Sequence, residues 1–87
     1  MSAWLRCHLE QGMFPREYAV EIDTSDAGRI SLFAPEEKVR FEDGLIRIDV
    51  LESLESNGAG VFVYLPSSPF EISSRTVRVP RTAVVSA

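Results

Sequence analysis

Alternation of apolar and polar residues with a period of two recurs along this chain, and turn residues separate the alternating runs. Successive side chains of a β-strand point to opposite faces of a sheet, so the pattern gathers apolar groups on one face. Between two such runs, residues 39–42 and 45–48, stands the dipeptide Asp43-Gly44. Asp-Gly is a strong hairpin signal because both central residues of a type I′ turn need a positive φ angle. The sequence therefore predicts a two-residue hairpin turn that places Arg40 opposite Arg47.

Further runs extend this pattern over the rest of the chain. We expect strands at residues 3–10, 17–23, 29–34, 39–42, 45–51, 61–65 and 75–79, and a tight turn with a last short strand at 82–85. The run at 61–65 is apolar on both faces, which indicates a central strand or one covered by a loop. Residues 35–38 begin with a proline and two acids, which favours one helical turn. Residues 51–54 fit either a helical turn or a bulged strand end.

Short strands without a convincing helix predict an all-β fold. Sandwiches usually need about 100 residues, so 87 residues favour a small antiparallel, partly open barrel of five to seven strands with at most one short helical turn. A chain of this length forms a single domain, residues 1–87. Residues 77–85 lead from a strand through Pro80 into a short closing strand, and this ending is similar in outline to SH3-like barrels. The resemblance implies a fold and carries no function, since the paired aromatic motifs of SH3 peptide sites have no counterpart here.

Charge and cysteine content narrow the expected partners and location. The net charge is −4, which argues against nucleic acid because phosphate contacts need basic surface. Twelve of the thirteen acids lie in residues 1–55, so the last third is mildly basic. The single cysteine, Cys7, fits a reducing compartment, and we expect the cytoplasm. The N-terminus lacks the apolar stretch of a signal peptide and no run reaches the length of a membrane span, so we expect no membrane association.

Residues that carry catalysis are scarce. Cys7 and His8 are adjacent in a strand and point to opposite faces, so the imidazole cannot easily activate the thiol. One histidine and one cysteine cannot build a zinc site within the chain, and residues 23–26 lack the spacing of a calcium loop. The glycines at 58 and 60 are followed by neither a lysine nor a helix, as a phosphate-binding loop would require. We therefore expect no enzyme, catalytic residue, metal or cofactor, and nothing indicates a small-molecule ligand.

Aromatic, apolar and arginine side chains are the candidates for an interaction. Trp4 falls on the polar face of its run and is either a binding anchor or packed under a loop or another aromatic ring. Phe70 and Ile72, in the Ser/Pro-rich loop at residues 66–74, either plug the barrel end or form an exposed apolar tip, with plugging preferred. Arg75, Arg78 and Arg81 form either a stripe that binds carboxylates or charges that prevent another strand from pairing with a sheet edge. The complete candidate set is Trp4, Phe33, Phe62, Tyr64, Phe70, Ile72, Arg75, Arg78 and Arg81.

These observations favour a small non-enzymatic module that binds another protein or a second copy of itself. Open strand edges offer one mode of binding. An alternative is a barrel that binds nucleic acid with Trp4, Phe62 or Tyr64 as stacking platforms and Arg75, Arg78 and Arg81 as the basic patch. A further alternative is an acidic surface that mimics nucleic acid and captures a basic partner.

Overall fold

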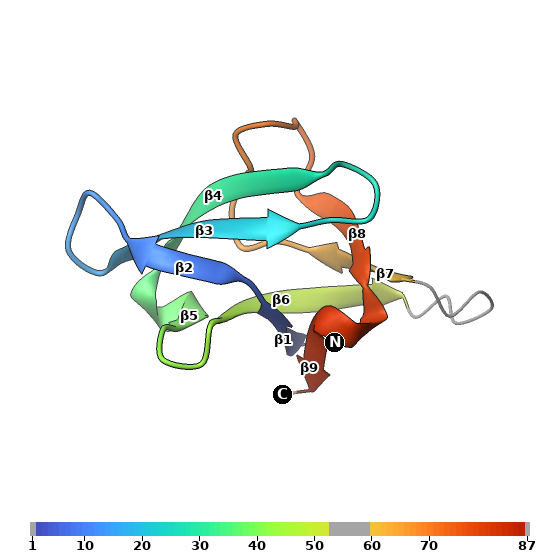
Figure 1. Ribbon diagram of the computed structural model, residues 1–87, viewed down its shortest axis with the longest axis horizontal. Coiled ribbons are helices and arrows are strands. Elements are labelled where there is room, and N and C mark those ends of the chain that lie inside the picture. The colour runs from blue at the N-terminus through green and yellow to red at the C-terminus, as the bar shows by residue number, and fades with distance from the viewer. Residues whose placement is uncertain (1, 53–59, 87) are drawn as a thin grey trace.

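The computed structural model describes residues 2–52 and 60–86, and these residues form nine strands and two short 3₁₀ turns (Figure 1). In chain order the elements are β1 (Ser2–Arg6), β2 (His8–Gln11), β3 (Glu17–Asp23), β4 (Arg29–Pro35), η1 (Glu36–Lys38), β5 (Val39–Arg40), β6 (Leu45–Glu52), β7 (Gly60–Tyr64), β8 (Thr76–Pro80), η2 (Arg81–Ala83) and β9 (Val84–Ser86). Every pairing between the described strands is antiparallel. The predicted all-β antiparallel fold is confirmed.

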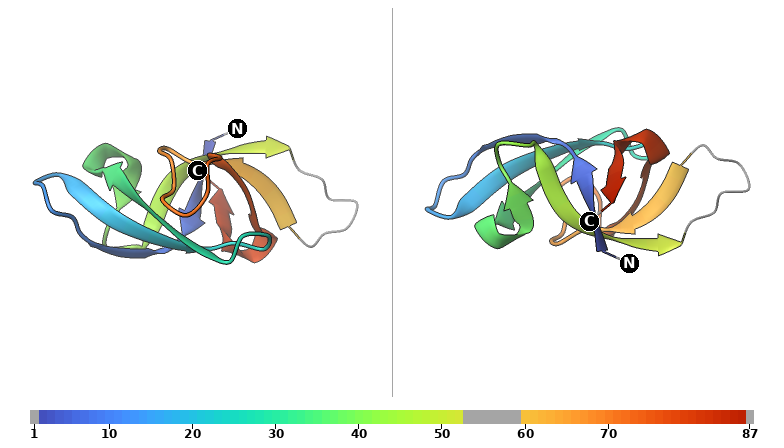
Figure 2. Two further views of the ribbon diagram at one scale, coloured as in Figure 1. Left: turned by 90° about the horizontal axis from the view of Figure 1, so that it is seen from above. Right: turned by 90° about the horizontal axis from the view of Figure 1, so that it is seen from below.

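The described strands form two sheets. The larger sheet has the order β8-β7-β6-β1-β9, and β5 also pairs with β6. The smaller sheet has the order β2-β3-β4, and its strands cross the upper half of Figure 1. Because β9 pairs with β1, the first and last strands of the chain lie side by side in Figure 2. No ladder joins the two sheets into a closed barrel within the described strands.

The first alternating run divides between the two sheets. β1 pairs with β6 in the larger sheet, whereas β2 pairs with β3 in the smaller one. Cys7 lies at the crossing point, and its backbone N–H donates to the carbonyl oxygen of Gly44 at 3.0 Å. The prediction of five to seven strands is therefore wrong for the described chain, since one run makes two strands and the C-terminal segment adds β9.

One apolar core lies between the inner faces of the two sheets. β3 buries Val20 and Ile22, and β8 buries Val77 and Val79, as the alternation predicts. The core cluster also takes Leu65, directly after β7, and residues from the other long strands: Ala3, Leu5, Ile30, Leu32, Ala34, Ile46, Ile48, Val61 and Val63. Non-directional burial of these side chains is the main force that holds the two sheets together.

The hairpin between β5 and β6 differs from its prediction. Val39 pairs with Ile46 and Arg40 with Leu45, so the connection has four residues, 41–44, instead of two. Within this connection only Gly44 has a positive φ angle, 68°, whereas a type I′ turn requires two. The Gly44 N–H donates to the carbonyl of Phe41 at 3.2 Å, and the Phe41 side chain is 48% exposed. Arg40 consequently does not lie opposite Arg47.

The predicted single helical turn is also corrected, because the described chain holds two. η1 occupies the predicted place, and η2 follows β8. Each turn begins after an extended proline, Pro35 or Pro80, whose fixed φ suits a helix start. The pairing of β6 with β7 is irregular between Val50 and Glu52, which matches the bulged strand end. The rest of the predicted segment 51–54 lies outside the described residues.

The loop after β7 covers the free edge of β4. The Phe70 N–H donates to the Ser31 carbonyl at 2.9 Å, and the Ser31 N–H donates to the Glu71 carboxylate at 2.7 Å. Hydrogen bonds from the Ser31 hydroxyl and backbone lower the pKa of Glu71. Such a cover removes an edge on which another strand could pair. Ile72 packs against the core, but Phe70 is 66% exposed, so the preferred expectation that both residues plug the fold is wrong for Phe70.

Candidate functional site

The outer face of the larger sheet gathers aromatic rings and guanidinium groups from distant parts of the chain. We call it the arginine–aromatic face and define it by Trp4, Arg40, Arg47, Phe62, Tyr64, Arg75 and Arg78. Strand register sets its layout: Trp4 pairs with Arg47, and Phe62 pairs with Arg78. Directly paired residues share one side of a sheet. Their neighbours in sequence, such as Leu5 and Val63, point into the core.

Trp4 is the most deeply placed ring of this face. Its exposed fraction is 7%, yet it lies outside the core cluster between the sheets. The guanidinium carbon of Arg40 lies 4.3 Å from the ring centroid, and that of Arg47 lies 5.4 Å from it. Both distances fall within the range of a cation–π contact. Trp4 therefore supports two cations on a sheet surface.

Two further rings carry arginines in the same way. The guanidinium carbon of Arg75 lies 4.5 Å from the Tyr64 ring centroid, and that of Arg78 lies 5.9 Å from Phe62. The Arg75 side chain also donates two hydrogen bonds to the Leu65 carbonyl, at 3.1 Å and 2.9 Å. These bonds fix the guanidinium group before any partner arrives, which lowers the entropy cost of binding.

The structure divides the predicted group of three C-terminal arginines. Arg75 and Arg78 join the arginine–aromatic face, whereas Arg81 lies in η2. The Nη2 atom of Arg81 is buried and has no hydrogen-bond partner among the described residues. Sequence reasoning missed Arg40 and Arg47, although the alternation had already placed both on the polar faces of their runs.

The remaining aromatic candidates lie on the smaller sheet. Phe33 pairs with Ala19 on its outer face, and Phe70 packs against Phe33 edge-on with ring centroids 5.3 Å apart. A hollow of about 220 Å³ lies beside them, and Glu10 and Glu21 are among its lining residues. The structure therefore separates Phe33 and Phe70 from Trp4, Phe62 and Tyr64.

The outer face of the smaller sheet is acidic but partly neutralised. Arg29 lies 2.9 Å from the Asp23 carboxylate and 3.5 Å from that of Glu21. The hydrogen bond from Arg29, together with its charge, lowers the pKa of Asp23. This internal pairing weakens the idea of an acidic mimic, because the carboxylates already have a cation.

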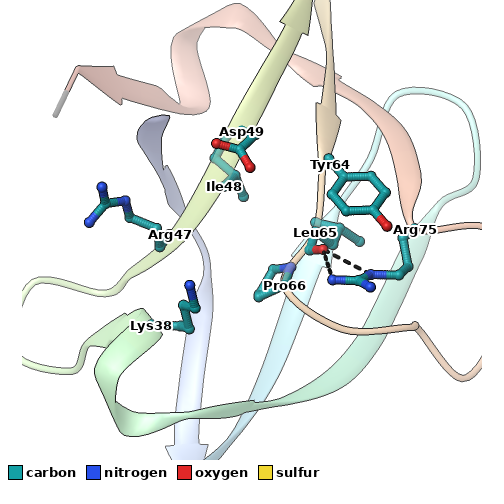
Figure 3. Close-up of a pocket in the computed structure, with 8 residues that line it drawn as sticks. All are labelled: Lys38, Arg47, Ile48, Asp49, Tyr64, Leu65, Pro66 and Arg75. Carbon is teal, nitrogen blue, oxygen red and sulfur yellow. Dashed lines mark hydrogen bonds between the residues drawn. The ribbon is translucent and has the colours of Figure 1, made fainter. Parts of the chain in front are cut away.

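A second hollow, of about 140 Å³, borders the arginine–aromatic face (Figure 3). It lies along one edge of β6, between the part that pairs with β5 and the part that pairs with β7, and we call it the β5–β7 hollow. Ile48 and Leu65 form its apolar floor, and both are buried. The remaining lining residues are Lys38, Arg47, Asp49, Tyr64, Pro66 and Arg75.

The cysteine and the histidine do not form a catalytic pair. Burial raises the pKa of the Cys7 thiol to about 12, so the nucleophilic thiolate is scarce at neutral pH. The His8 ring instead lies 3.2 Å from the carboxylate of Glu10. Within residues 2–52 and 60–86, no three side chains of His, Cys, Asp or Glu are grouped to hold a metal ion.

None of the helical segments in the described ranges has the length and apolar character needed to cross a membrane. Comparison of the chain with protein-family models, with curated proteins and with solved structures finds no match.

Proposed function

We propose that this chain is a small non-enzymatic module that binds another protein through its arginine–aromatic face. The observation that carries the proposal is the covering of Trp4, Tyr64 and Phe62 by guanidinium groups on one sheet surface. Trp, Tyr and Arg are the residue types enriched at the energetic centres of protein interfaces. A face of guanidinium groups on a chain of net charge −4 favours a partner segment rich in carboxylates, which accept bidentate hydrogen bonds from Arg.

The test compares the face with an arginine outside it. The double variant Arg40→Gln/Arg47→Gln removes both cations over Trp4, and Arg29→Gln removes a cation from the smaller sheet as the matched control. Affinity capture from the native cell should recover at least one protein with both the wild type and the control. The double variant should recover about tenfold less of that protein, or even less. Titration with that protein should also change the fluorescence of Trp4, the only tryptophan. Equal recovery by the double variant and the control would refute the proposal.

Binding to a second copy is one version of this proposal. The basic outer face of the larger sheet and the acidic outer face of the smaller sheet are complementary in charge, which favours association between copies. Sedimentation velocity from micromolar to millimolar concentration tests it. A contact between two different faces is head-to-tail, so it can build chains as well as dimers. Self-association that Arg40→Gln/Arg47→Gln reverses supports the version, and a strict monomer excludes it.

Single-stranded nucleic acid is a second candidate, since Trp4, Phe62 and Tyr64 share one face with arginines. Two observations favour protein over nucleic acid: the rings lie beneath guanidinium groups, and the net charge is negative. Titration with oligothymidine at several salt concentrations decides between them. Binding that weakens steeply with salt supports nucleic acid.

The finer fold and the location belong to the same proposal. A partly open barrel of SH3-like outline is supported by the passage of the chain between sheets at Cys7 and by the order β8, Pro80, η2, β9. An experimental structure in which β1 and β2 paired within one flat sheet, or in which β9 did not pair with β1, would overturn it. A cytoplasmic location rests on the single cysteine, and imaging of the tagged chain in its native cell tests it.

A further inference from the structure

The geometry points to the β5–β7 hollow as a binding site for one carboxylate, supplied by an Asp or Glu side chain of an acidic partner segment. This inference rests on the proposed function and narrows it to one hollow and one chemical group.

The hollow exists because the larger sheet is interrupted along one edge of β6. β5 pairs with β6 as far as Ile46, and the β7 pairing begins at Asp49. On the opposite edge, β1 pairs with β6 through the whole interval. Within the described chain, no strand therefore pairs with β6 at Arg47 and Ile48 on this edge, although β1 pairs with them on the other edge. Such a gap gives a ligand group access to the sheet.

The charge around the gap is positive in an otherwise acidic protein. Lys38, Arg47 and Arg75 line the hollow, against a single acid, Asp49. In Figure 3, Lys38 and Arg75 approach the hollow from opposite sides, whereas the Arg47 side chain runs away from it and places its guanidinium group over Trp4. No ion pair neutralises these three bases within the described parts of the chain. The buried apolar floor of Ile48 and Leu65 lowers the local dielectric constant, which strengthens the attraction of an anion to these bases.

Size and polarity favour a carboxylate of a peptide over a nucleotide. The volume of about 140 Å³ is well below the roughly 300–1,000 Å³ of pockets for drug-sized ligands, so it suits one short side chain. Asp49 repels a doubly charged phosphate more strongly than a singly charged carboxylate. Its carboxylate also accepts a hydrogen bond, which a peptide backbone N–H beside the bound side chain donates.

The probe for this site is a fluorescein-labelled hexaglutamate peptide, titrated at low salt and followed by anisotropy. Lys38→Gln should weaken its binding roughly three- to fivefold, since Lys38 is exposed and an exposed ion pair contributes modestly. Asp49→Asn should strengthen binding by a similar factor, because it removes the repulsion and keeps an acceptor oxygen. Arg29→Gln should leave the affinity within about twofold, because Arg29 lies on the other sheet and already pairs with carboxylates. A hexaglutamine peptide should not bind.

A variant that folds poorly would bind the peptide more weakly. The expected gain in affinity with Asp49→Asn therefore distinguishes a direct effect on the binding site from an effect on folding. Three results would overturn the inference: no binding of hexaglutamate, equal losses with Lys38→Gln and Arg29→Gln, or tighter binding of a hexathymidine oligonucleotide than of hexaglutamate. If the captured partner depends on Arg40 and Arg47 but not on Lys38, this inference fails and the proposed function stands. If capture depends on none of them, the proposed function fails.

Discussion

Replacement of Trp4 by alanine measures how strongly the arginine–aromatic face is built into the fold. Only 7% of Trp4 is exposed. A buried aromatic side chain removes about 150–250 Å² from water, which at about 25 cal/mol per Å² corresponds to roughly 4–6 kcal/mol. Part of that area is already buried in the unfolded chain, so we expect Trp4→Ala to lower the free energy of unfolding by about 3–4 kcal/mol.

That loss is large for a chain of 87 residues, whose total stability is about 4–13 kcal/mol. The midpoint of thermal unfolding should fall by roughly 12–30 °C. Urea unfolding followed by far-UV circular dichroism measures the change, since the variant has no tryptophan. Tyr64→Ala is the matched control on the same face, and it should cost about half as much because Tyr64 is 38% exposed. A loss below about 1 kcal/mol for Trp4→Ala would refute the reasoning.

A double-mutant cycle separates ring burial from the cation–π contact. Trp4→Leu and Arg40→Met keep apolar bulk and remove the ring or the charge. Since the guanidinium carbon lies 4.3 Å from the ring centroid, we expect a coupling energy of about 0.5–2 kcal/mol between Trp4 and Arg40. A coupling near zero would mean that burial alone holds the ring.

Three substitutions and one chemical modification test local features of the fold. Gly12→Ala places a Cβ 2.6 Å from the carbonyl oxygen of Glu17 and should cost about 1–3 kcal/mol in urea unfolding. It should cost more than Gly28→Ala, which has open space and only an unfavourable φ of +70°; the reverse order would contradict the packing. Iodoacetamide at about pH 8 should alkylate Cys7 much more slowly in the folded than in the urea-unfolded protein, and equal rates would contradict a pKa of about 12. The pKa of Glu71 is lowered in the folded protein, so the stabilising effect of its carboxylate is present above pH 4.5 and is lost as the pH falls further. Glu71→Gln should therefore make the free energy of unfolding less dependent on pH in that range. An unchanged pH profile would contradict the hydrogen bonds from Ser31 of β4 to Glu71.

Local alternation accounts for the parts of the fold that sequence predicted well. The strand at Glu17–Asp23 has its predicted bounds, and Val77 and Val79 face the core as expected. A period of two fixes which side chains share a face wherever one face is buried. The doubly apolar run at 61–65 also marked Phe62 and Tyr64 as rings that the core does not take, and the structure places them against arginines.

The same alternation cannot tell one hairpin register from another that differs by two residues. The predicted and observed pairings of β5 with β6 differ by that shift, and in both of them Val39 faces the core. A shift of two preserves the facing of every residue that stays in a strand, so only the packing of the whole sheet selects the four-residue connection. Arg40 reaches Trp4 in the selected register.

The sequence by itself determined the class of fold, the positions of most strands and their inward faces, because these follow from interactions between near neighbours. It did not determine that the run at 3–10 divides into two strands. Tertiary structure alone decided that Arg40 and Arg47 cover Trp4, and that Lys38 and Arg75 meet at the β5–β7 hollow. These contacts join residues far apart in the chain, and they depend on which strands become neighbours and where their pairing stops. Non-local pairing is set by burial of the whole core, which no local pattern encodes.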